Sequence, residues 1–263
     1  MSLEQLESTP RHDLPDSVII LGVRVDRFSQ YQAINRIEQL VEERRASQGQ
    51  IPCQQVVTVN PEFVMAAQKH TEFRQAINTA TLSLPDGAGV VWATRYKKQP
   101  APERVTGTDL LPPLAERCAA KGYRLYLLGA ASGIAEAAAD KLRQNYPNLQ
   151  IAGTYAGSPA PAEENEIIER ISAARADMLC VAYGAPAQEL WIYRNLHRLP
   201  TAVAIGVGGA FDFISGHQRR APKFFQKSGL EWLYRLYREP WRWRRMLALP
   251  LFAVKVALKG RKN

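Results

Sequence analysis

The side chains best suited to chemistry stand at the ends of short apolar runs. Thr58 and Asn60 end one such run, and Asp86 follows the next in a Pro-Asp-Gly sequence. Asn and Asp at a helix start ordinarily cap the helix, and Pro-Asp-Gly ordinarily forms a turn, so each residue also has a purely structural interpretation. A carboxylate brought to one edge beside Thr and Asn side chains can instead accept a proton from a hydroxyl group as a general base.

Two further loops carry groups that bind anions. Arg104 lies in a polar loop, where a guanidinium can bind an anionic group, and Thr108 is the predicted cap of the helix that follows. Gly129 and Ala130 open a loop of small residues before another helix, where backbone N–H groups and the helix dipole can meet a phosphate. This loop matches neither of the common nucleotide-binding glycine patterns, so it is a weak signal alone.

Two later loops complete the set of candidates. Gln188, with Glu189 beside it, offers an amide after one apolar run. Gly206 begins a stretch of three glycines after the last run, and the small residues let a ribose or a flat ring approach the backbone. Asp212 follows them and can accept hydrogen bonds.

The sequence lacks a recognisable metal-binding pattern. An Asp-x-Asp pair is absent, the four histidines are scattered, and the three cysteines show neither metal-ligand spacing nor a disulfide framework. We therefore predict no metal and no cofactor, and a reduced, cytoplasmic setting. If a nucleotide diphosphate leaves during the reaction, arginines and helix N-termini must stabilise its charge.

These loops need a scaffold that gathers strand ends. A strand or short hairpin is predicted at residues 18–25, followed by a helix that Ser29 caps. Strands are then predicted over residues 55–59, 81–84, 124–128, 149–154, 178–182 and 202–207. Helices are predicted between them, over residues 61–70, 88–96, 109–121, 134–146, 162–174 and 187–197. This alternation is typical of an α/β, Rossmann-like and mainly parallel sheet with helices on both faces, whose strand-to-helix loops meet at one edge.

Charge divides the chain into a body and a tail. The net charge is +9 over 263 residues, but residues 219–263 hold thirteen Lys and Arg against two acids, while the rest is nearly neutral. We predict a polar leader at residues 1–17, a Rossmann-like domain at 18–215 and a helical, basic, Trp-rich appendage at 216–263. The leader is too polar for a signal peptide. The apolar run at residues 246–254 is shorter than the ~20 residues that span a bilayer.

The tail predicts an anionic membrane partner. Trp232, Trp241 and Trp243 alternate with arginines, and Trp favours the headgroup layer while cations pair with anionic lipids. An ordinary packed helix with snorkelling arginines explains any single arginine, but not the whole surplus. Single-stranded nucleic acid is the alternative partner. Because no RNA-binding signature is present, we expect no nucleic acid.

Six motifs follow one another in a fixed order. They are Thr58-x-Asn60-Pro61-Glu62, Pro85-Asp86-Gly87, Glu103-Arg104-Val105-Thr106-Gly107-x-Asp109, Gly184-x-Pro186-x-Gln188-Glu189, Gly206-Val207-Gly208-Gly209-Ala210-Phe211-Asp212, and Arg220-Ala221-Pro222 followed by Gly229-Leu230-Glu231-Trp232-Leu233-Tyr234-Arg235-Leu236. Together they closely resemble the WecG/TagA/CpsF glycosyltransferase family, over about residues 18–245. One departure is Ala187, where the family commonly has a lysine.

The resemblance implies an activity and its partners. Such enzymes transfer N-acetylmannosamine or a related sugar from a UDP-sugar to an undecaprenyl-diphosphate-linked amino sugar, by inversion and without an essential metal. They build wall teichoic acid, enterobacterial common antigen or exopolysaccharide. A polyprenyl-diphosphate-linked acceptor implies an enzyme attached peripherally to the inner face of the cell membrane, where the tail docks and closes over the site.

The resemblance also implies residue roles. Asp86 is then the general base that activates the acceptor hydroxyl. The sugar and acceptor pocket is lined by Thr58, Asn60, Arg104 and Gln188. UDP is held by Gly129, Ala130, Gly206 and Asp212. The departing diphosphate is stabilised by Arg235, Arg242 and Arg245.

Two other classes of protein compete with this interpretation. A nucleotide-dependent oxidoreductase on a Rossmann-like sheet needs a G-x-G-x-x-G loop after its first strand and an acid about twenty residues on, and the early strands lack both. A non-enzymatic membrane or nucleic-acid binding module leaves Asp86 and Arg104 without a role, so Asp86→Asn would then be harmless. For the transferase, deletion of the residues after Gly216 is expected to abolish transfer and leave a folded, more soluble body.

Overall fold

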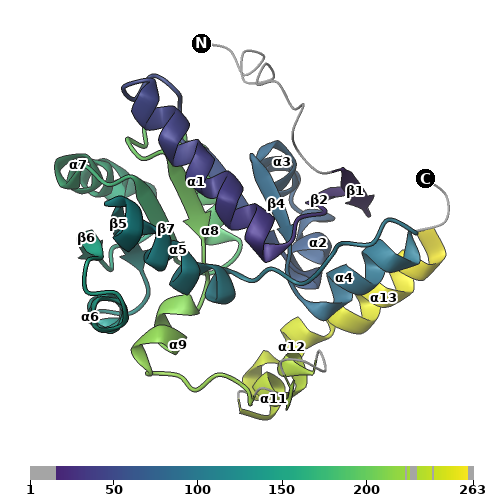
Figure 1. Cartoon of the computed structure of the whole chain (residues 1–263). Coiled ribbons are helices and arrows are strands. Elements are labelled where there is room, and N and C mark those ends of the chain that lie inside the picture. The colour runs from purple at the N-terminus through teal and green to yellow at the C-terminus, as the bar shows by residue number, and fades with distance from the viewer. Residues whose placement is uncertain (1–15, 223, 226–229, 239, 260–263) are drawn as a thin grey trace.

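A six-stranded parallel sheet forms the centre of the protein. The computed structural model describes residues 16–222, 224–225, 230–238 and 240–259 (Figure 1). The strand order is β4-β3-β8-β7-β5-β6, and every neighbouring pair is parallel. The strands are β3 (Gln54–Val59), β4 (Leu82–Pro85), β5 (Arg124–Gly129), β6 (Gln150–Tyr155), β7 (Met178–Ala182) and β8 (Val203–Gly206). All six predicted strands are thereby confirmed, together with the α/β fold class.

The first apolar run forms a hairpin outside this sheet. Strands β1 (Ser17–Ile20) and β2 (Val23–Asp26) pair in antiparallel fashion. Leu21 and Gly22 connect them with φ angles of +51° and +81°, as a two-residue turn that matches the strand twist requires. The Asp26 carboxylate accepts a hydrogen bond from the Ser83 N–H at 2.7 Å, which fixes the hairpin against β4. The alternative of a short hairpin at residues 18–25 is therefore correct.

Helices cover both faces of the sheet. Leu125 and Leu127 pack in a core with helices α1 (Gln30–Ala46), α5 (Gly107–Lys121) and α6 (Ile134–Asn145). Tyr126 and Leu128 of the same strand point to the other face, where α7 (Glu164–Ala174) and α8 (Ala187–Asn195) pack. Beside them a third core joins the hairpin to α2 (Pro61–Ala67), α3 (Thr71–Thr79) and α4 (Ala88–Tyr96). Because strand residues alternate between the faces, both layers bury apolar side chains.

Helix starts are mostly as predicted, with one correction. Ser29 caps α1 in a capping box with Gln32, and Asn60 caps α2. The predicted cap at Thr108 is wrong, because Thr106 caps α5 and accepts a hydrogen bond from the Asp109 N–H at 3.0 Å. The helix therefore begins at Gly107 rather than at Asp109, and Thr108 lies within its first turn.

Three short elements were not predicted. The predicted helix at residues 61–70 ends as α2 at Ala67, and α3 follows it as a separate helix. The last strand leads into the short helix α9 (Ala210–Ser215). A single 3-10 turn, η2 (Pro161–Glu163), precedes α7, so the predicted helix at residues 162–174 is divided there.

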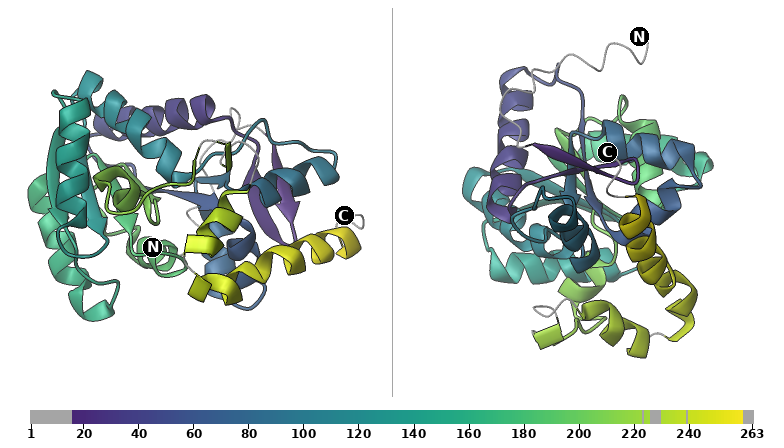
Figure 2. Two further views of the ribbon diagram at one scale, coloured as in Figure 1. Left: turned by 90° about the horizontal axis from the view of Figure 1, so that it is seen from below. Right: turned by 90° about the vertical axis from the view of Figure 1, so that its right-hand side faces the viewer.

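The described part of the tail is not helical over residues 216–222 but forms helices from residue 231 onward, and its last helix packs on the body. The elements are α11 (Glu231–Arg238), η3 (Pro240–Arg242), α12 (Trp243–Met246) and α13 (Ala248–Lys259). Figures 1 and 2 show α13 alongside α4. Phe252 and Val256 are each 1% exposed in the core that also holds α2 and α4, so removal of the residues after Gly216 takes them out of that core. None of the helices in the described residues is long and apolar enough to cross a membrane.

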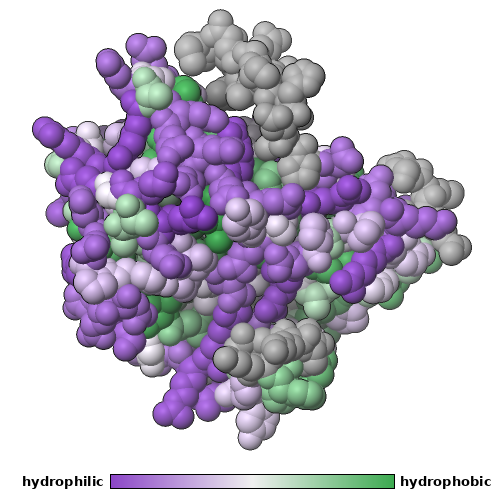
Figure 3. All heavy atoms as spheres, in the orientation of Figure 1, coloured by the Kyte–Doolittle hydropathy of each residue, from purple (hydrophilic) through white to green (hydrophobic). Residues whose placement is uncertain are grey.

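The tail also presents apolar side chains to solvent. Leu251, Val254 and Leu258 of α13 are exposed at helical spacing, and so is Leu247 just before the helix. Trp232, Trp241 and Trp243 are exposed on the preceding elements. Figure 3 shows apolar residues gathered at the end of the molecule where α11 and α12 lie and along α13.

Candidate active site

Asn60 and Asp86 meet at the carboxyl edge of the sheet. Strands β3 and β4 pair with Val59 opposite Pro85, and the Asp86 N–H donates to the Val59 carbonyl at 2.8 Å. The residue at the start of α4 is Gly87, with φ of +83° and no side-chain cap. A Cβ atom on the nearby Gly89 would lie 2.8 Å from Pro61 Cγ, so only glycine lets the start of α4 approach α2 this closely. Asp86 therefore does not cap a helix.

Burial gives Asp86 the proton affinity of a general base. Asp86 is partly buried, and burial raises the pKa of its carboxyl from 3.8 to about 7. Arg104 opposes this rise, Glu231 and Asp109 add to it, and Arg220 opposes it. A carboxyl group with a pKa near neutrality can both hold and release a proton under physiological conditions.

The four charged groups around Asp86 form a network that we call the ionic clasp: Arg104, Asp109, Arg220 and Glu231. Arg104 Nη1 lies 3.1 Å from Glu231 Oε2, and Arg220 Nε lies 3.0 Å from Glu231 Oε1. Arg220 also grips Asp109 through two N–H donors, the Nη2 contact being 2.9 Å. The clasp brings Arg104 and the start of α5 together with Arg220 and Glu231 of the tail around the Asp86 carboxyl group.

The hydrogen bonds between Asp109 and Arg220 keep both of these groups charged. Burial tends to raise the pKa of Asp109, but hydrogen bonds from Arg220 and Thr106 outweigh burial, so this pKa is lowered. The hydrogen bond to Asp109 in turn raises the pKa of Arg220 further above its ordinary value. Asp109 and Arg220 thus stay charged, whereas the pKa of Asp86 is raised to about 7.

Gly107 lets the start of α5, which carries Asp109 of the clasp, lie close to the end of β8. A Cβ atom on Gly107 would lie 2.9 Å from the Val207 Cα and 3.2 Å from its carbonyl oxygen. Any larger residue would push the start of α5 away from that strand. The arrangement holds Thr106 and Asp109 beside the glycine stretch that Gly206 begins.

The structure places Gln188 between two loops. Gln188 is buried, and its Oε1 accepts the N–H groups of Gly184 at 3.0 Å and of Gly208 at 3.2 Å. Asn60 uses its Oδ1 to cap α2 through the Phe63 N–H at 3.0 Å. Thr58 is also buried at the end of β3. Asn60 thus lies beside Asp86, while Thr58 and Gln188 support the surrounding strand ends.

Two glycine loops meet where a nucleotide was predicted. Helix α6 packs beside α9, so the Gly129 loop and the loop after Gly206 are neighbours. The backbone at Gly129 and Ala130 is left-handed, with φ of +101° and +64°, and the Ala130 N–H donates to the Ala182 carbonyl at 3.0 Å. Helix α6 begins just after Gly133, which provides no side-chain cap, and Asp212 lies partly exposed in the first turn of α9.

Three predicted ligands fall outside what the structure describes. The side chains of Arg235, Arg242 and Arg245 lie outside the described residues, although the backbone around them belongs to α11, η3 and α12. Their role at the diphosphate stays a prediction. Among the described residues, no three His, Cys, Asp or Glu side chains come together in a group that could hold a metal ion.

Sequence reasoning missed three members of the clasp. Asp109, Arg220 and Glu231 all stood within the recognised motifs, but none was given a role. Glu231 entered only as one of the two acids counted against the thirteen Lys and Arg of residues 219–263. The signal that was available is the opposite charge of Arg220 and Glu231 within one motif of the chain.

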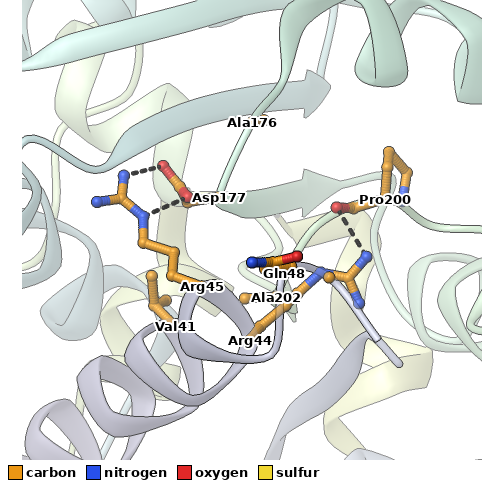
Figure 4. A pocket seen from close by; sticks show the side chains of 9 residues that line it. Val41, Arg44, Arg45, Gln48, Ala176, Asp177, Pro200 and Ala202 are labelled. Atoms are coloured by element: carbon orange, nitrogen blue, oxygen red, sulfur yellow. Dashed lines mark hydrogen bonds and ion pairs between the residues drawn. The ribbon is translucent and has the colours of Figure 1, made fainter. Parts of the chain in front are cut away.

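A hollow at the opposite edge of the sheet is not the candidate active site. It has a volume of about 210 Å³ and lies by the amino ends of β7 and β8. Figure 4 shows its two arginines pointing at protein acceptors rather than into open space. Arg45 binds both oxygens of Asp177 at 2.9 and 2.8 Å, and Arg44 donates to the Pro200 carbonyl at 3.1 Å. Their charges are already engaged, so the candidate active site is at the carboxyl edge.

Comparisons with known proteins show which family of transferases the chain resembles. The model of the family described as the glycosyl transferase WecG/TagA/CpsF family matches residues 18–263. A protein of Bacillus subtilis is 38% identical over 208 residues, which cover 79% of this chain and 80% of the relative. A protein of Bacillus spizizenii is 37% identical over 201 residues, covering 76% and 77%. A protein of Staphylococcus aureus is 31% identical over 262 residues, covering 100% and 98%. Each of the three is named an N-acetylglucosaminyldiphosphoundecaprenol N-acetyl-beta-D-mannosaminyltransferase.

Proposed function

The chain belongs to the WecG/TagA/CpsF family of glycosyltransferases, and we propose that it moves N-acetylmannosamine or a related hexose or hexosamine from a UDP-sugar to an undecaprenyl-diphosphate-linked amino sugar. The names of its relatives support this donor sugar and this lipid-linked acceptor. The product would feed the synthesis of a cell-surface polysaccharide. The observation that carries the proposal is Asp86, a carboxyl group with a pKa of about 7 beside Arg104 at the substrate edge of the sheet.

Asp86 acts as the general base in the proposed reaction. Its carboxylate takes the proton of the acceptor hydroxyl, and the hydroxyl oxygen forms a bond to the anomeric carbon of the donor sugar. The bond from that carbon to the UDP oxygen breaks, and UDP leaves with the electron pair. One displacement at one carbon inverts its configuration. Asn60 lies beside Asp86, where its amide can orient the sugar.

Cationic groups stabilise the departing diphosphate without a metal ion. Arg104 influences Asp86 directly, and its guanidinium is held in place by Glu231 at 3.1 Å. Positive groups that are already oriented cost little reorganisation when charge develops on the leaving oxygen. We propose that Arg235, Arg242 and Arg245 of the tail add to this charge when substrate is bound.

The glycine loops hold the nucleotide. Gly129 and Ala130 lie just before the uncapped start of α6, whose N–H groups and dipole favour a diphosphate. Gly206 ends the strand β8 and Asp212 lies on the helix α9 that follows, where the ribose and base of UDP can approach. Gln188 contributes by holding the Gly184 and Gly208 loops together.

We propose that the tail holds this site at a membrane surface. The exposed apolar row on α13 and the exposed tryptophans of α11, η3 and α12 carry the side chains that enter a headgroup layer. The basic surplus of residues 219–263 matches an anionic surface, where each Lys or Arg contributes about 1 kcal/mol. Attachment to the inner face of the cell membrane would bring the lipid-linked acceptor to Asp86.

A donor screen tests this function. Release of UDP is followed with several UDP-sugars, UDP-N-acetylmannosamine among them, and an acceptor in which N-acetylglucosamine is linked to a polyprenyl diphosphate. Vesicles of anionic lipid carry the acceptor. We expect release that depends on both the donor and the acceptor, and a product in which the anomeric configuration is inverted. Release of UDP from none of these donors would contradict the proposal.

A further inference from the structure

Glu189 is a carboxyl group buried without a compensating charge. It lies in the first turn of α8 and is 0% exposed. Its Oε2 has no hydrogen-bond partner among the residues that the structure describes. It lies against Gln188 of its own helix, Gly206 of β8 and Gln55 of β3, whose side chain donates to the Glu189 carbonyl at 3.1 Å. All are uncharged, and no charged side chain of the described residues contributes to its pKa.

The hydrogen bonds of Gln188 have only one consistent direction. Its Oε1 accepts two backbone N–H groups, from Gly184 and Gly208. Since those partners can only donate, the amide must present its NH₂ group on the other side. That NH₂ group lies 2.6 Å from Glu189 Oε1, which must therefore act as an acceptor. Glu189 thus accepts from the NH₂ group of the Gln188 amide and helps to hold the amide in this orientation.

The end of β8 is shaped around this pair. A Cβ atom on Gly206 would lie 2.5 Å from Glu189 Oε1 and 2.6 Å from Gln188 Nε2. Both of these atoms belong to buried side chains, so neither can move away easily. Only glycine at this position lets the strand lie against the pair.

The two loops that Gln188 joins face open space. Gly184 and Gly208 have φ angles of +77° and +54°, and a Cβ atom built on either would meet nothing within 4 Å. They lie after β7 and β8, at the carboxyl edge where ligands of such sheets bind. The spacing of the loops therefore sets the width of one wall of the substrate site.

We propose that Glu189 is a positioning residue which, as a neutral carboxylic acid, orients the Gln188 amide and so holds the Gly184 and Gly208 loops at the spacing that the substrate needs. The proposal rests on the proposed transferase function for its effect on substrate. The neutral state follows from burial without an opposite charge, and burial raises the pKa of Glu189 from 4.5 to about 8, although the Gln188 hydrogen bond opposes the rise.

The first test measures stability against pH and needs no activity. The unfolded chain loses the Glu189 proton near pH 4.5, whereas the folded chain keeps it up to about pH 8. The stability that this proton supplies is fully present below pH 4.5 and is lost as pH rises to about 8. Glu189→Gln keeps the acceptor oxygen and cannot ionise. The ratio of its folding equilibrium constant to that of the natural protein should rise by up to about tenfold per pH unit between pH 5.5 and 7.5.

Urea unfolding of the full chain at several pH values supplies these constants. The matched control is Glu169→Gln, because Glu169 is an exposed acid of α7. Its stability curve should run parallel to that of the natural protein. If the Glu189→Gln curve also runs parallel, Glu189 is not a neutral acid and the proposal is overturned.

The second test asks whether Glu189 acts through Gln188. Glu189→Ala leaves the Gln188 NH₂ group without its acceptor, and we expect the KM for UDP-sugar to rise about tenfold while Glu189→Gln stays near the natural value. Gln188→Ala should raise KM similarly, and the double variant should be no worse than either single variant. Additive effects, or a failure of Glu189→Gln to keep KM low, would contradict the positioning role. If the natural protein transfers no sugar, the stability test still decides the neutral state.

Discussion

The titration of Asp86 predicts how the rate depends on pH. With a pKa of about 7, the carboxyl is roughly nine-tenths ionised at pH 8 and one-tenth ionised at pH 6. A general base works only in its ionised form, so kcat/KM should fall about tenfold between pH 8 and pH 6. An aspartate that kept its ordinary pKa of 3.8 would be ionised at both values, and the rate would then be flat across this range.

The fall of kcat/KM toward low pH is the acidic limb of the pH profile. Substitutions in the ionic clasp should shift this limb along the pH axis, in a direction that depends on the charge removed. Arg104 lowers the pKa of Asp86, so Arg104→Gln should shift the limb to higher pH. Glu231 raises it, so Glu231→Gln should shift the limb to lower pH. The assay measures initial rates of UDP release at low donor concentration, in mixed buffers of constant ionic strength. Histidine also changes charge near neutral pH, so His217→Asn is the control and should leave the limb in place.

A flat profile between pH 6 and 8 would refute the assignment of Asp86 as a buried base. Shifts of the same sign in the Arg104 and Glu231 variants would refute the claim that the clasp sets its proton affinity. The two results are separable, because the first concerns burial and the second concerns charge.

Three further predictions concern the leaving group, the tail and the start of α5. Excess EDTA should leave the rate of UDP release unchanged, and loss of activity restored by a divalent cation would contradict a metal-independent reaction. Phe252→Ala should lower the free energy of unfolding by about 3–5 kcal/mol in urea titrations, because Phe252 is 1% exposed, while Leu258→Ala, at a 75% exposed site, should change it by less than about 0.5 kcal/mol. Gly107→Ala should lower kcat and stability together, because its Cβ would lie 2.9 Å from the Val207 Cα; an unchanged kcat would show that the clasp tolerates a shift of α5.

The sequence predicts this fold well because its signals are local. Each strand is a short apolar run followed by a loop of small residues, and both faces of the sheet are buried, so the runs are nearly continuous. Asn60 as the cap of α2 is equally local, since cap and first turn are adjacent in sequence. The start of α5 was misplaced by two residues although its signal is local, because Thr106 and Thr108 are both residue types that cap helices, and it is Thr106 that accepts from the Asp109 N–H.

The candidate site was harder to predict than the fold because its contacts join residues that are far apart in the sequence. Asp86 and Arg104 were found because each follows a strand or lies in a motif. The clasp partners Arg220 and Glu231 were missed, since their pairing depends on how the tail returns to α5. The packing of α13 was missed as well, because the apolar residues that face the body and those that face solvent share one helix of mixed composition.

The role of Asp86 is tested most directly by Asp86→Asn, which keeps the shape of the side chain and removes the base. With the natural donor and acceptor, kcat should fall by about 10²–10⁴-fold. Binding of the UDP-sugar, measured by calorimetry, should stay within about threefold of the natural protein, because the nucleotide loops are untouched. A kcat that is unchanged in this variant would contradict the account, and Asp86 would then be only a turn residue between β4 and α4.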